Sequence, residues 1–319
     1  MIEVENLRAG YGQDDRFVAA VDDVSLVVAD DEILGIAGES GCGKSTLMRS
    51  LYGDFTSGLR LQSGSIKAHF TDPASGRSVA RDGPRLKDLW WDTIAYVPQG
   101  SMSVLNPVMQ VGKQILDALP KRERAGTAKA LRTRLATFLA GLGLPETVLD
   151  AYPHQLSGGM RQRVLVALAA FIDPRLILAD EPTTALDVVV QKRILIMLYE
   201  IQRRLKNALV LVSHDLGVHF QIADRIAIAY AGKLVEIGPT AEVFAAPQHP
   251  YTQALIGALP RVGQRDERVG LDGRPPSLAA PPPGCRFAPR CPEATALCQD
   301  EEPALVPRKA GRPVACHFR

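Results

Sequence analysis

The sequence predicts an α/β protein whose core is a mostly parallel β-sheet with helices on both faces. Up to about residue 240, short apolar runs typical of strands alternate with stretches of helical periodicity. One of these strands runs into a glycine-rich turn that opens a helix. This alternation indicates parallel strands, because a parallel connection needs a crossover and the crossover is usually a helix.

The expected elements follow in chain order. The strand-like runs are Ile2–Leu7, Val24–Val28, Ile33–Ala37, Ile94–Val97, Leu176–Ala179, Ala208–Ser213 and Arg225–Tyr230. The stretches with a helical pattern are Lys44–Leu51, Pro107–Leu144, Ser157–Phe171, a segment that ends near Arg204, and a short helix between the last two strands. The block between Pro107 and Pro153 interrupts the alternation, so it is expected to be a helical insertion.

Composition and charge describe an ordinary globular chain. Of its 319 residues 46% are hydrophobic and 23% charged, and the formal net charge is +2. This near balance gives no reason to expect nucleic acid as a partner. No run approaches the roughly 20 apolar residues that span a bilayer, and the start, MIEVENL, does not resemble a signal peptide. A cytosolic protein is expected, with any membrane contact made through a partner.

A phosphate-binding loop is predicted directly after the strand Ile33–Ala37. The loop reads GESGCGKST and satisfies the pattern G-x-x-x-x-G-K-S/T. Its backbone N–H groups are expected to form an anion-binding concavity, with Lys44 on the β/γ-phosphates and Ser45 on Mg²⁺. Glycine is expected at Gly38 and Gly43, where a Cβ would block the phosphates or the required φ. The predicted nucleotide-binding residues of the loop are Gly38, Glu39, Ser40, Gly41, Cys42, Gly43, Lys44, Ser45 and Thr46.

Two adjacent carboxylates are predicted to complete the chemistry. The segment Leu176–Glu181 reads LILADE, in which an apolar strand delivers Asp180 to the edge of the sheet beside the phosphate loop. This position suits a Mg²⁺ ligand. Glu181 follows and would face the attacking water as general base. An apolar run that ends in Asp-Glu is by itself often just the end of a core strand, and the phosphate loop upstream favours the functional interpretation.

A more specific resemblance begins at Gln155–Arg163, which reads QLSGGMRQR. These residues resemble the LSGGQ signature of the ABC ATPase family, with Met160 in place of the usual glutamine. The resemblance implies a P-loop NTPase fold of RecA-like type with a helical subdomain. It also implies that the signature residues Ser157, Gly158 and Gly159 contact ATP bound to a partner subunit, so that two nucleotides lie between two ATPase chains.

The same resemblance assigns the remaining site residues. Gln99 resembles the Q-loop glutamine that senses Mg²⁺ and water. Asp187, in TTALD, matches the D-loop, and His214, in LVSHD, matches the switch histidine at the γ-phosphate. Tyr11 is the candidate for the aromatic residue that stacks on adenine, with Phe17 as the alternative. Glu181, His214 and Gln99 are thus the expected catalytic group.

Three further stretches resemble the dipeptide/oligopeptide importers. They are MSVLNPVMQVGKQI (residues 102–115), AYPHQLSGGMRQRV (151–164) and HPYTQALIGALP (249–260). The resemblance implies an importer with two permease subunits, two related ATPases (a heterodimer or a homodimer) and an extracytoplasmic binding protein. This chain would lie on the cytoplasmic face of the inner or plasma membrane, with residues 101–110 against a permease. Nickel or oligosaccharide import, and a soluble ABC ATPase of iron–sulfur assembly, ribosomes or DNA, are the alternatives.

The expected domains are an ATPase domain over residues 1–240, with a helical subdomain at about 103–163, and an extension over 241–319. The extension is rich in proline and contains four of the five cysteines, spaced C-x5-C-x6-C-x17-C. It lacks the tight knuckle of structural zinc sites. Some members of the resembled family carry a 4Fe–4S cluster here, which makes a cluster the preferred hypothesis, with zinc, free thiols or a disulfide as alternatives. The four candidate ligands are Cys285, Cys291, Cys298 and Cys316.

Overall fold

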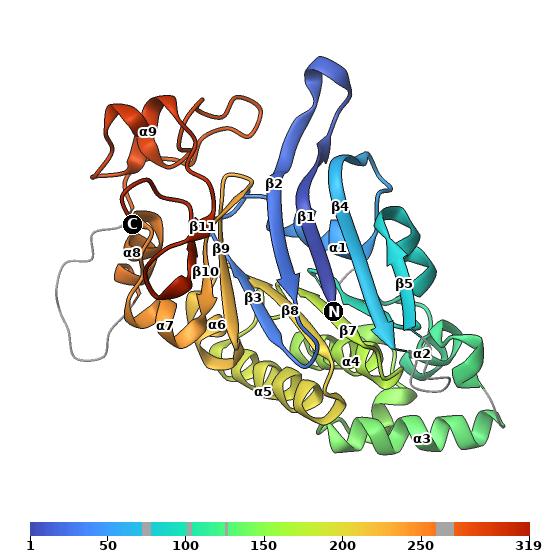
Figure 1. The fold of residues 1–319 in the computed structure, drawn as a ribbon. Coiled ribbons are helices and arrows are strands. Elements are labelled where there is room, and N and C mark those ends of the chain that lie inside the picture. The colour runs from blue at the N-terminus through green and yellow to red at the C-terminus, as the bar shows by residue number, and fades with distance from the viewer. Residues whose placement is uncertain (72–77, 101–103, 125–126, 260–270) are drawn as a thin grey trace.

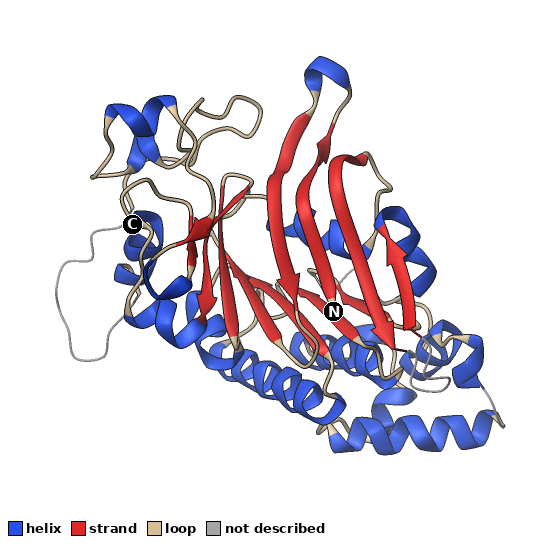
Figure 2. Ribbon diagram, in the orientation of Figure 1, coloured by secondary structure: helices blue, strands red, loops and turns tan. Residues whose placement is uncertain are grey.

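The computed structural model describes residues 1–71, 78–100, 104–124, 127–259 and 271–319. Its strands form two sheets, one of eight strands and one of four (Figures 1 and 2). Residues 101–103 of the expected permease-contact segment lie outside the described residues, as does residue 260 at the end of the third importer-like stretch.

The larger sheet contains the predicted parallel core. Its strand order is β11-β12-β10-β9-β3-β8-β7-β6. Five neighbouring strands pair in parallel, namely β9 (Arg225–Tyr230), β3 (Ile33–Ala37), β8 (Ala208–Ser213), β7 (Leu176–Asp180) and β6 (Ile94–Val97). The antiparallel edge strands are β10 (Lys233–Pro239), β12 (Pro313–Val314) and β11 (Val306–Pro307). The parallel strands are covered on both faces, which is why they consist of continuous apolar runs.

We expected helices on both faces of the parallel sheet, but the smaller sheet covers one of them. It is antiparallel and consists of β2 (Val18–Val28), β1 (Ile2–Tyr11), β4 (Leu59–Thr71) and β5 (Ser78–Asp82). This sheet covers one side of the parallel sheet, with α1 (Lys44–Tyr52) packed between the two sheets. Sequence patterns missed β4 and β5 because their described residues are partly exposed and give no long apolar run.

Helices cover the opposite face of the parallel sheet (Figure 1). These are α2 (Val111–Ala118), α3 (Ala128–Gly141), α4 (Gly158–Phe171), α5 (Val188–Leu205) and α6 (Leu216–Ile222). The helices α2 and α3 of the insertion share one hydrophobic core with α4, α5 and the sheet. Single-turn and 3-10 segments are η1 (Asp14–Arg16), η2 (Gly83–Leu89), η3 (Lys121–Arg124), η4 (Glu146–Leu149), η5 (Pro153–Gln155), η6 (Ala288–Arg290) and η7 (Lys309–Gly311). None of the helices in the described ranges is both long and apolar enough to span a bilayer.

The C-terminal extension shares a hydrophobic core with β9 and β10. It contains α7 (Thr240–Ala245), α8 (Pro250–Gly257) and α9 (Ala296–Asp300), and β12 adds to the edge of the large sheet beside β10. The rings of Tyr230, Tyr251 and Phe287 are buried together, with centroids 4.5–5.5 Å apart. Since Tyr230 ends β9, aromatic packing anchors a segment that is too poor in apolar residues to build its own core.

A buried carboxylate fixes the start of this extension. Glu236 of β10 is fully buried and accepts hydrogen bonds from the backbone N–H groups of Gln248 (3.0 Å) and His249 (2.9 Å). Arg312, from the other end of the extension, places its guanidinium 3.7 Å from the same carboxylate. One side chain of the sheet therefore holds both ends of the extension.

Replacing Glu236 with alanine is expected to destabilise the protein by about 3 kcal/mol, because two buried N–H groups and a buried guanidinium lose their partner. The denaturant midpoint measured by circular dichroism checks this. The matched control is Glu200→Ala on the exposed face of α5, which is expected to change stability by at most about 0.5 kcal/mol. Equal midpoints for the two variants would show that Glu236 is not the anchor.

Candidate functional site

The phosphate loop lies where β3 ends and α1 begins, as predicted. Gly43 has a φ of 101°, and a Cβ built on it would lie 2.0 Å from the carbonyl oxygen of Ala20. A Cβ on Gly38 would lie 2.1 Å from the carbonyl oxygen of Ala229. The sequence analysis explained the need for glycine at both positions by contact with the phosphates or by the required φ. In the structure Gly43 needs glycine for its φ, and both positions need it because neighbouring backbone approaches closely.

Lys44 occupies the centre of this loop. Its Nζ donates hydrogen bonds to the carbonyl oxygens of Gly38 and Glu39, both at 2.8 Å, and lies 3.6 Å from Sγ of Cys42. The side chain is buried, so its charge acts in a medium of low polarity. Burial raises the pKa of the Cys42 thiol, so this thiol stays neutral. The loop therefore offers a positive, backbone-lined site that suits phosphate.

Ser45 and Asp180 lie together at the edge of the sheet, although 135 positions separate them in sequence. The Ser45 hydroxyl donates to Oδ1 of Asp180 at 3.3 Å, and the Tyr96 hydroxyl donates to Oδ2 at 3.0 Å. Burial raises the pKa of the Asp180 carboxyl group. A hydroxyl and a carboxylate are oxygen donors of the kind that Mg²⁺ prefers, so these residues fit the predicted metal. Sequence reasoning missed Tyr96, which gave no signal beyond its place in a strand beside Asp180.

Glu181 is the centre of the expected catalytic group. Its Oε2 accepts hydrogen bonds from Nε2 of Gln99 and from Oγ1 of Thr184, both at 2.8 Å. Its Oε1 lies 3.4 Å from Nδ1 of His214. The structure thus brings together Gln99, Glu181 and His214, which were predicted from separate motifs. Thr184 was missed, although its position three residues after Glu181 in a turn was the available signal.

The backbone of Glu181 is unusual. Its φ is 47°, in the left-handed region that residues with a Cβ rarely adopt. Such a conformation costs of the order of 1 kcal/mol and persists only where the surroundings enforce it. Here the Glu181 N–H donates to the Val212 carbonyl on β8, which fixes the turn after β7. The strained turn directs the carboxylate to Gln99 and His214.

The signature residues lie at the start of α4, beside the start of α5. Ser157 caps α4 by accepting a hydrogen bond from the Met160 N–H at 3.2 Å, and Asp187 caps α5 by accepting from the Val190 N–H at 3.0 Å. A Cβ on Gly159 would lie 2.4 Å from Cγ1 of Val190, so a glycine is needed where α5 approaches. Within the described ranges no hydrogen bond joins Ser157 to the phosphate loop. The two features are separate parts of one chain.

Tyr11 lies next to the helix that follows the phosphate loop. Its hydroxyl is 3.4 Å from Oγ1 of Thr46 and 3.4 Å from a guanidinium nitrogen of Arg49, both on α1. The ring is half-buried at the end of β1. Phe17, the alternative, follows the turn η1 and is also half-buried. The adenine-stacking role of Tyr11 stays a prediction, and its position beside Thr46 is compatible with it.

The four cysteines of the extension converge. Cys285, Cys291, Cys298 and Cys316 line one pocket, and all five cysteines of the chain are free thiols, which excludes the disulfide alternative in this structure. Burial raises the pKa values of the Cys285 and Cys291 thiols. In the part of the chain that the structure describes, no group of three or more Cys, His, Asp or Glu side chains is arranged to hold a metal ion. The four thiols therefore lie around one pocket, but they are not arranged as the ligands of a metal ion.

Comparison with known proteins gives two family matches. Residues 21–184 match the model described as ABC transporter, and residues 235–298 match the model described as oligopeptide/dipeptide transporter, C-terminal region. The chain is 39% identical to the dipeptide transport ATP-binding protein DppD of Bacillus subtilis (strain 168), over 99% of this chain and 94% of that protein. It is 38% identical to the oligopeptide transport ATP-binding protein OppD of Salmonella typhimurium, over 99% of this chain and 93% of that protein.

Solved structures give the same fold. The chain is similar to a dimeric, post-hydrolysis state of the ATP-binding cassette MJ0796 bound to ADP and Pi, with a TM-score of 0.63 and 25% sequence identity. The match covers 75% of this chain and 99% of that chain. A second dimeric structure of the same cassette gives a TM-score of 0.61 at 25% identity. The predicted P-loop NTPase fold is confirmed.

The buried Asp180 predicts a pH dependence of stability. Because the folded protein raises the pKa of this carboxyl group above its ordinary value of 3.8, the folded state binds the proton more tightly than the unfolded chain. Its contribution to stability is present below that value and is lost as pH rises through the folded-state pKa. Asp180→Asn cannot ionise, so its stability relative to wild type is expected to increase with pH and then level off.

Thermal midpoints measured from pH 5 to pH 8 without nucleotide or Mg²⁺ check this expectation. The control is Asp88→Asn, which changes an exposed carboxylate of η2. A difference between Asp180→Asn and wild type that shrinks as pH rises would contradict the argument.

Proposed function

Because this chain belongs to the ABC transporter family, in the group with the oligopeptide/dipeptide transporter C-terminal region, we propose that it energises the import of dipeptides or oligopeptides. The chain is an ATPase, and its hydrolysis of ATP drives an ABC importer. The observation that carries this function is the group around Glu181, which lies directly after Asp180 and within reach of Gln99 and His214. The names of the relatives favour peptides over nickel or oligosaccharides.

In the proposed mechanism each residue has one task. The loop N–H groups and Lys44 bind the phosphates, and Ser45 and Asp180 would hold Mg²⁺, which when bound neutralises charge on the phosphate oxygens. Glu181 accepts the proton of the attacking water. Gln99 and Thr184 donate to one carboxylate oxygen of Glu181, so the base has a fixed orientation. His214 lies near the other oxygen and would contact the γ-phosphate.

The proposed site is complete only when a homologous ATPase subunit contributes its own signature residues. The supporting observation is that the solved ATP-binding cassette structures to which this chain is similar are dimeric. Apolar side chains are also exposed next to Asp187, where Val188 is 80% and Val189 62% exposed. Such exposure at the start of a helix suits a protein contact. The partner is a second, related ATPase or another copy of this chain.

The permease contact is proposed at the segment that precedes α2. Within it Val104 is 45% and Val108 82% exposed, although both are apolar. Two permease subunits and an extracytoplasmic binding protein complete the proposed importer, and this chain attaches to the cytoplasmic face through the permeases. Peptide specificity then resides in those partners.

Glu181→Gln is expected to bind MgATP within about two-fold of wild type but to lose turnover by about 10³-fold, because the amide keeps the shape and cannot accept the proton. Equilibrium binding of a fluorescent ATP analogue and phosphate release by the complete transporter measure the two quantities. Glu200→Gln on α5 serves as the control with unchanged turnover. Hydrolysis at the wild-type rate in Glu181→Gln would remove Glu181 as the base.

We propose in addition that the extension carries a 4Fe–4S cluster. The supporting observation is that four thiols line one pocket, and four thiolates are the usual ligand set of such a cluster. A cluster is larger than a single ion, so its sulfur ligands stand farther apart than those of a zinc site. The thiols therefore need not form a single-ion site in order to fit. Bound there, the cluster would stabilise the extension, and no step of ATP hydrolysis uses it.

Cys291→Ser is expected to remove most of the iron, the sulfide and the brown colour from protein that is purified without oxygen, since one of four ligands is lost. Cys42→Ser is the matched control, because Cys42 lies in the phosphate loop and not in the pocket. Iron and sulfide analysis with the visible spectrum gives the readout. Iron-free wild-type protein from an anaerobic preparation would exclude the cluster.

A further inference from the structure

The C-terminal extension holds a residue of the phosphate loop directly. Arg290, the last residue of η6, donates to both carboxylate oxygens of Glu39, at 2.7 Å from one guanidinium nitrogen and 3.0 Å from another. The side chain of Arg290 is only 4% exposed, and that of Glu39 is 26% exposed. A bidentate pair with little access to water is the strongest common form of ion pair in proteins. This contact joins residues 251 positions apart.

Every polar group of Glu39 is occupied. Its backbone N–H donates to the hydroxyl of Tyr251 at 3.0 Å, and its carbonyl accepts from Nζ of Lys44 at 2.8 Å. Tyr251 and Arg290 both belong to the extension. The extension therefore fixes the main chain and the side chain of Glu39, and Glu39 in turn receives Lys44.

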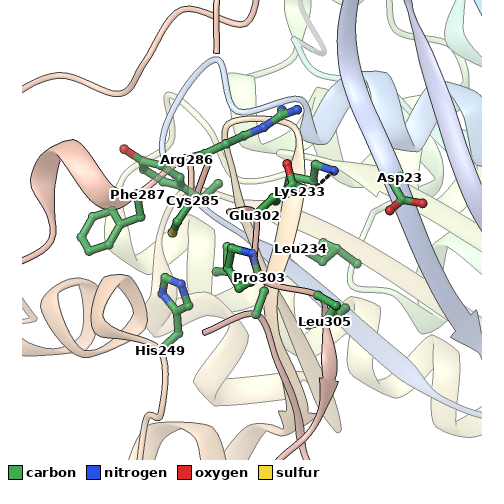
Figure 3. A pocket seen from close by; sticks show the side chains of 14 residues that line it. Asp23, Lys233, Leu234, His249, Cys285, Arg286, Phe287, Glu302, Pro303 and Leu305 are labelled. Atoms are coloured by element: carbon green, nitrogen blue, oxygen red, sulfur yellow. Dashed lines mark ion pairs between the residues drawn. The ribbon is translucent and has the colours of Figure 1, made fainter. Parts of the chain in front are cut away.

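A second arginine of the extension connects it to the phosphate loop indirectly, through the turn between β9 and β10. Arg286 donates to the carbonyl of Ala231 and pairs with Asp22, and the neighbouring Gly232 N–H donates to the Cys42 carbonyl at 2.9 Å. In Figure 3 the guanidinium of Arg286 points away from the sulfur of Cys285. The turn between β9 and β10 thus lies between the extension and the middle of the phosphate loop.

The negative charge of Glu39 means that its ion pair with Arg290 can affect the binding of phosphate. A carboxylate within a loop that binds a triphosphate repels the ligand, and the repulsion is strong where water is partly excluded. Arg290 places an opposite charge in direct contact with that carboxylate. Lys44, a cation of the loop itself, contacts the carbonyl oxygen of Glu39 and not its carboxylate. Neutralisation of Glu39 therefore comes from the extension.

We propose that the C-terminal extension is a positioning element of the ATP site, in which Arg290 neutralises and fixes Glu39 so that the phosphate loop accepts a triphosphate. The proposal rests on the proposed function, since it assumes that the loop binds ATP. Arg290 is a positioning residue, because it acts on the nucleotide through Glu39. The proposal requires no metal or cluster in the extension.

The test measures MgATP binding to the full chain with a fluorescent ATP analogue, and the KM and kcat of the complete transporter. Arg290→Gln is expected to weaken binding and raise KM by about five-fold or more, with kcat at saturating ATP within about two-fold of wild type. The matched control is Arg274→Gln, which removes an exposed arginine of the same extension and is expected to change neither value.

A double variant separates charge from folding. If Arg290 acts by neutralising Glu39, then Glu39→Gln combined with Arg290→Gln is expected to restore MgATP binding to within about two-fold of Glu39→Gln alone. Wild-type binding by Arg290→Gln, or a double variant as weak as Arg290→Gln, would overturn the proposal. A fall in kcat with unchanged KM would do the same. Wild-type protein that fails to bind MgATP would instead refute the proposed function of the phosphate loop.

Discussion

The parallel register of β3, β8 and β7 is the constraint on which the site depends. Ala37, the last residue before the phosphate loop, pairs with Ser213, and Asp180 pairs with Val212. Three strands therefore end level at one edge of the sheet, and each is followed by a functional segment. A shift of one residue would turn Asp180 to the opposite face of the sheet, because side chains alternate along a strand. The site is thus held by backbone pairing between three fully buried strands.

Function at this edge opposes stability. Asp180 keeps a carboxylate in a buried position, where its charged form is disfavoured, and Glu181 adopts a left-handed backbone conformation. Both features persist because the surrounding sheet and α1 are well packed and supply the stability that the site lacks. The hydroxyls of Ser45 and Tyr96 offset part of the cost of burying Asp180 by donating to it.

The sequence predicted those parts whose pattern depends on local burial. The runs at β3, β6, β8 and β9 were placed with the bounds that the structure has, because strands buried on both faces are continuously apolar. Residues within motifs, such as Lys44 and Glu181, could be proposed from the sequence because the chemistry needs fixed spacings. The strand β4 was missed because it is half-exposed, and β10 was missed because only a short turn separates it from β9. Tyr96 and Arg290 act through contacts with residues far away in the sequence, which no spacing indicates.

A domain boundary drawn from composition separates the extension from the ATPase domain, although the two pack closely together. Cysteine and proline content separates residues 241–319 from the rest, yet β12 pairs with β10 and the ring of Phe287 packs on Tyr230. Arg286, which holds the turn between β9 and β10, directly follows Cys285, and Arg290, which contacts Glu39 of the loop, directly precedes Cys291, so each arginine is next to a cysteine of the pocket. Because a covalent neighbour cannot move independently, the geometry of the thiol pocket and that of the phosphate loop are linked through two short segments. The extension therefore packs against the phosphate loop through Tyr251 and Arg290, which both contact Glu39.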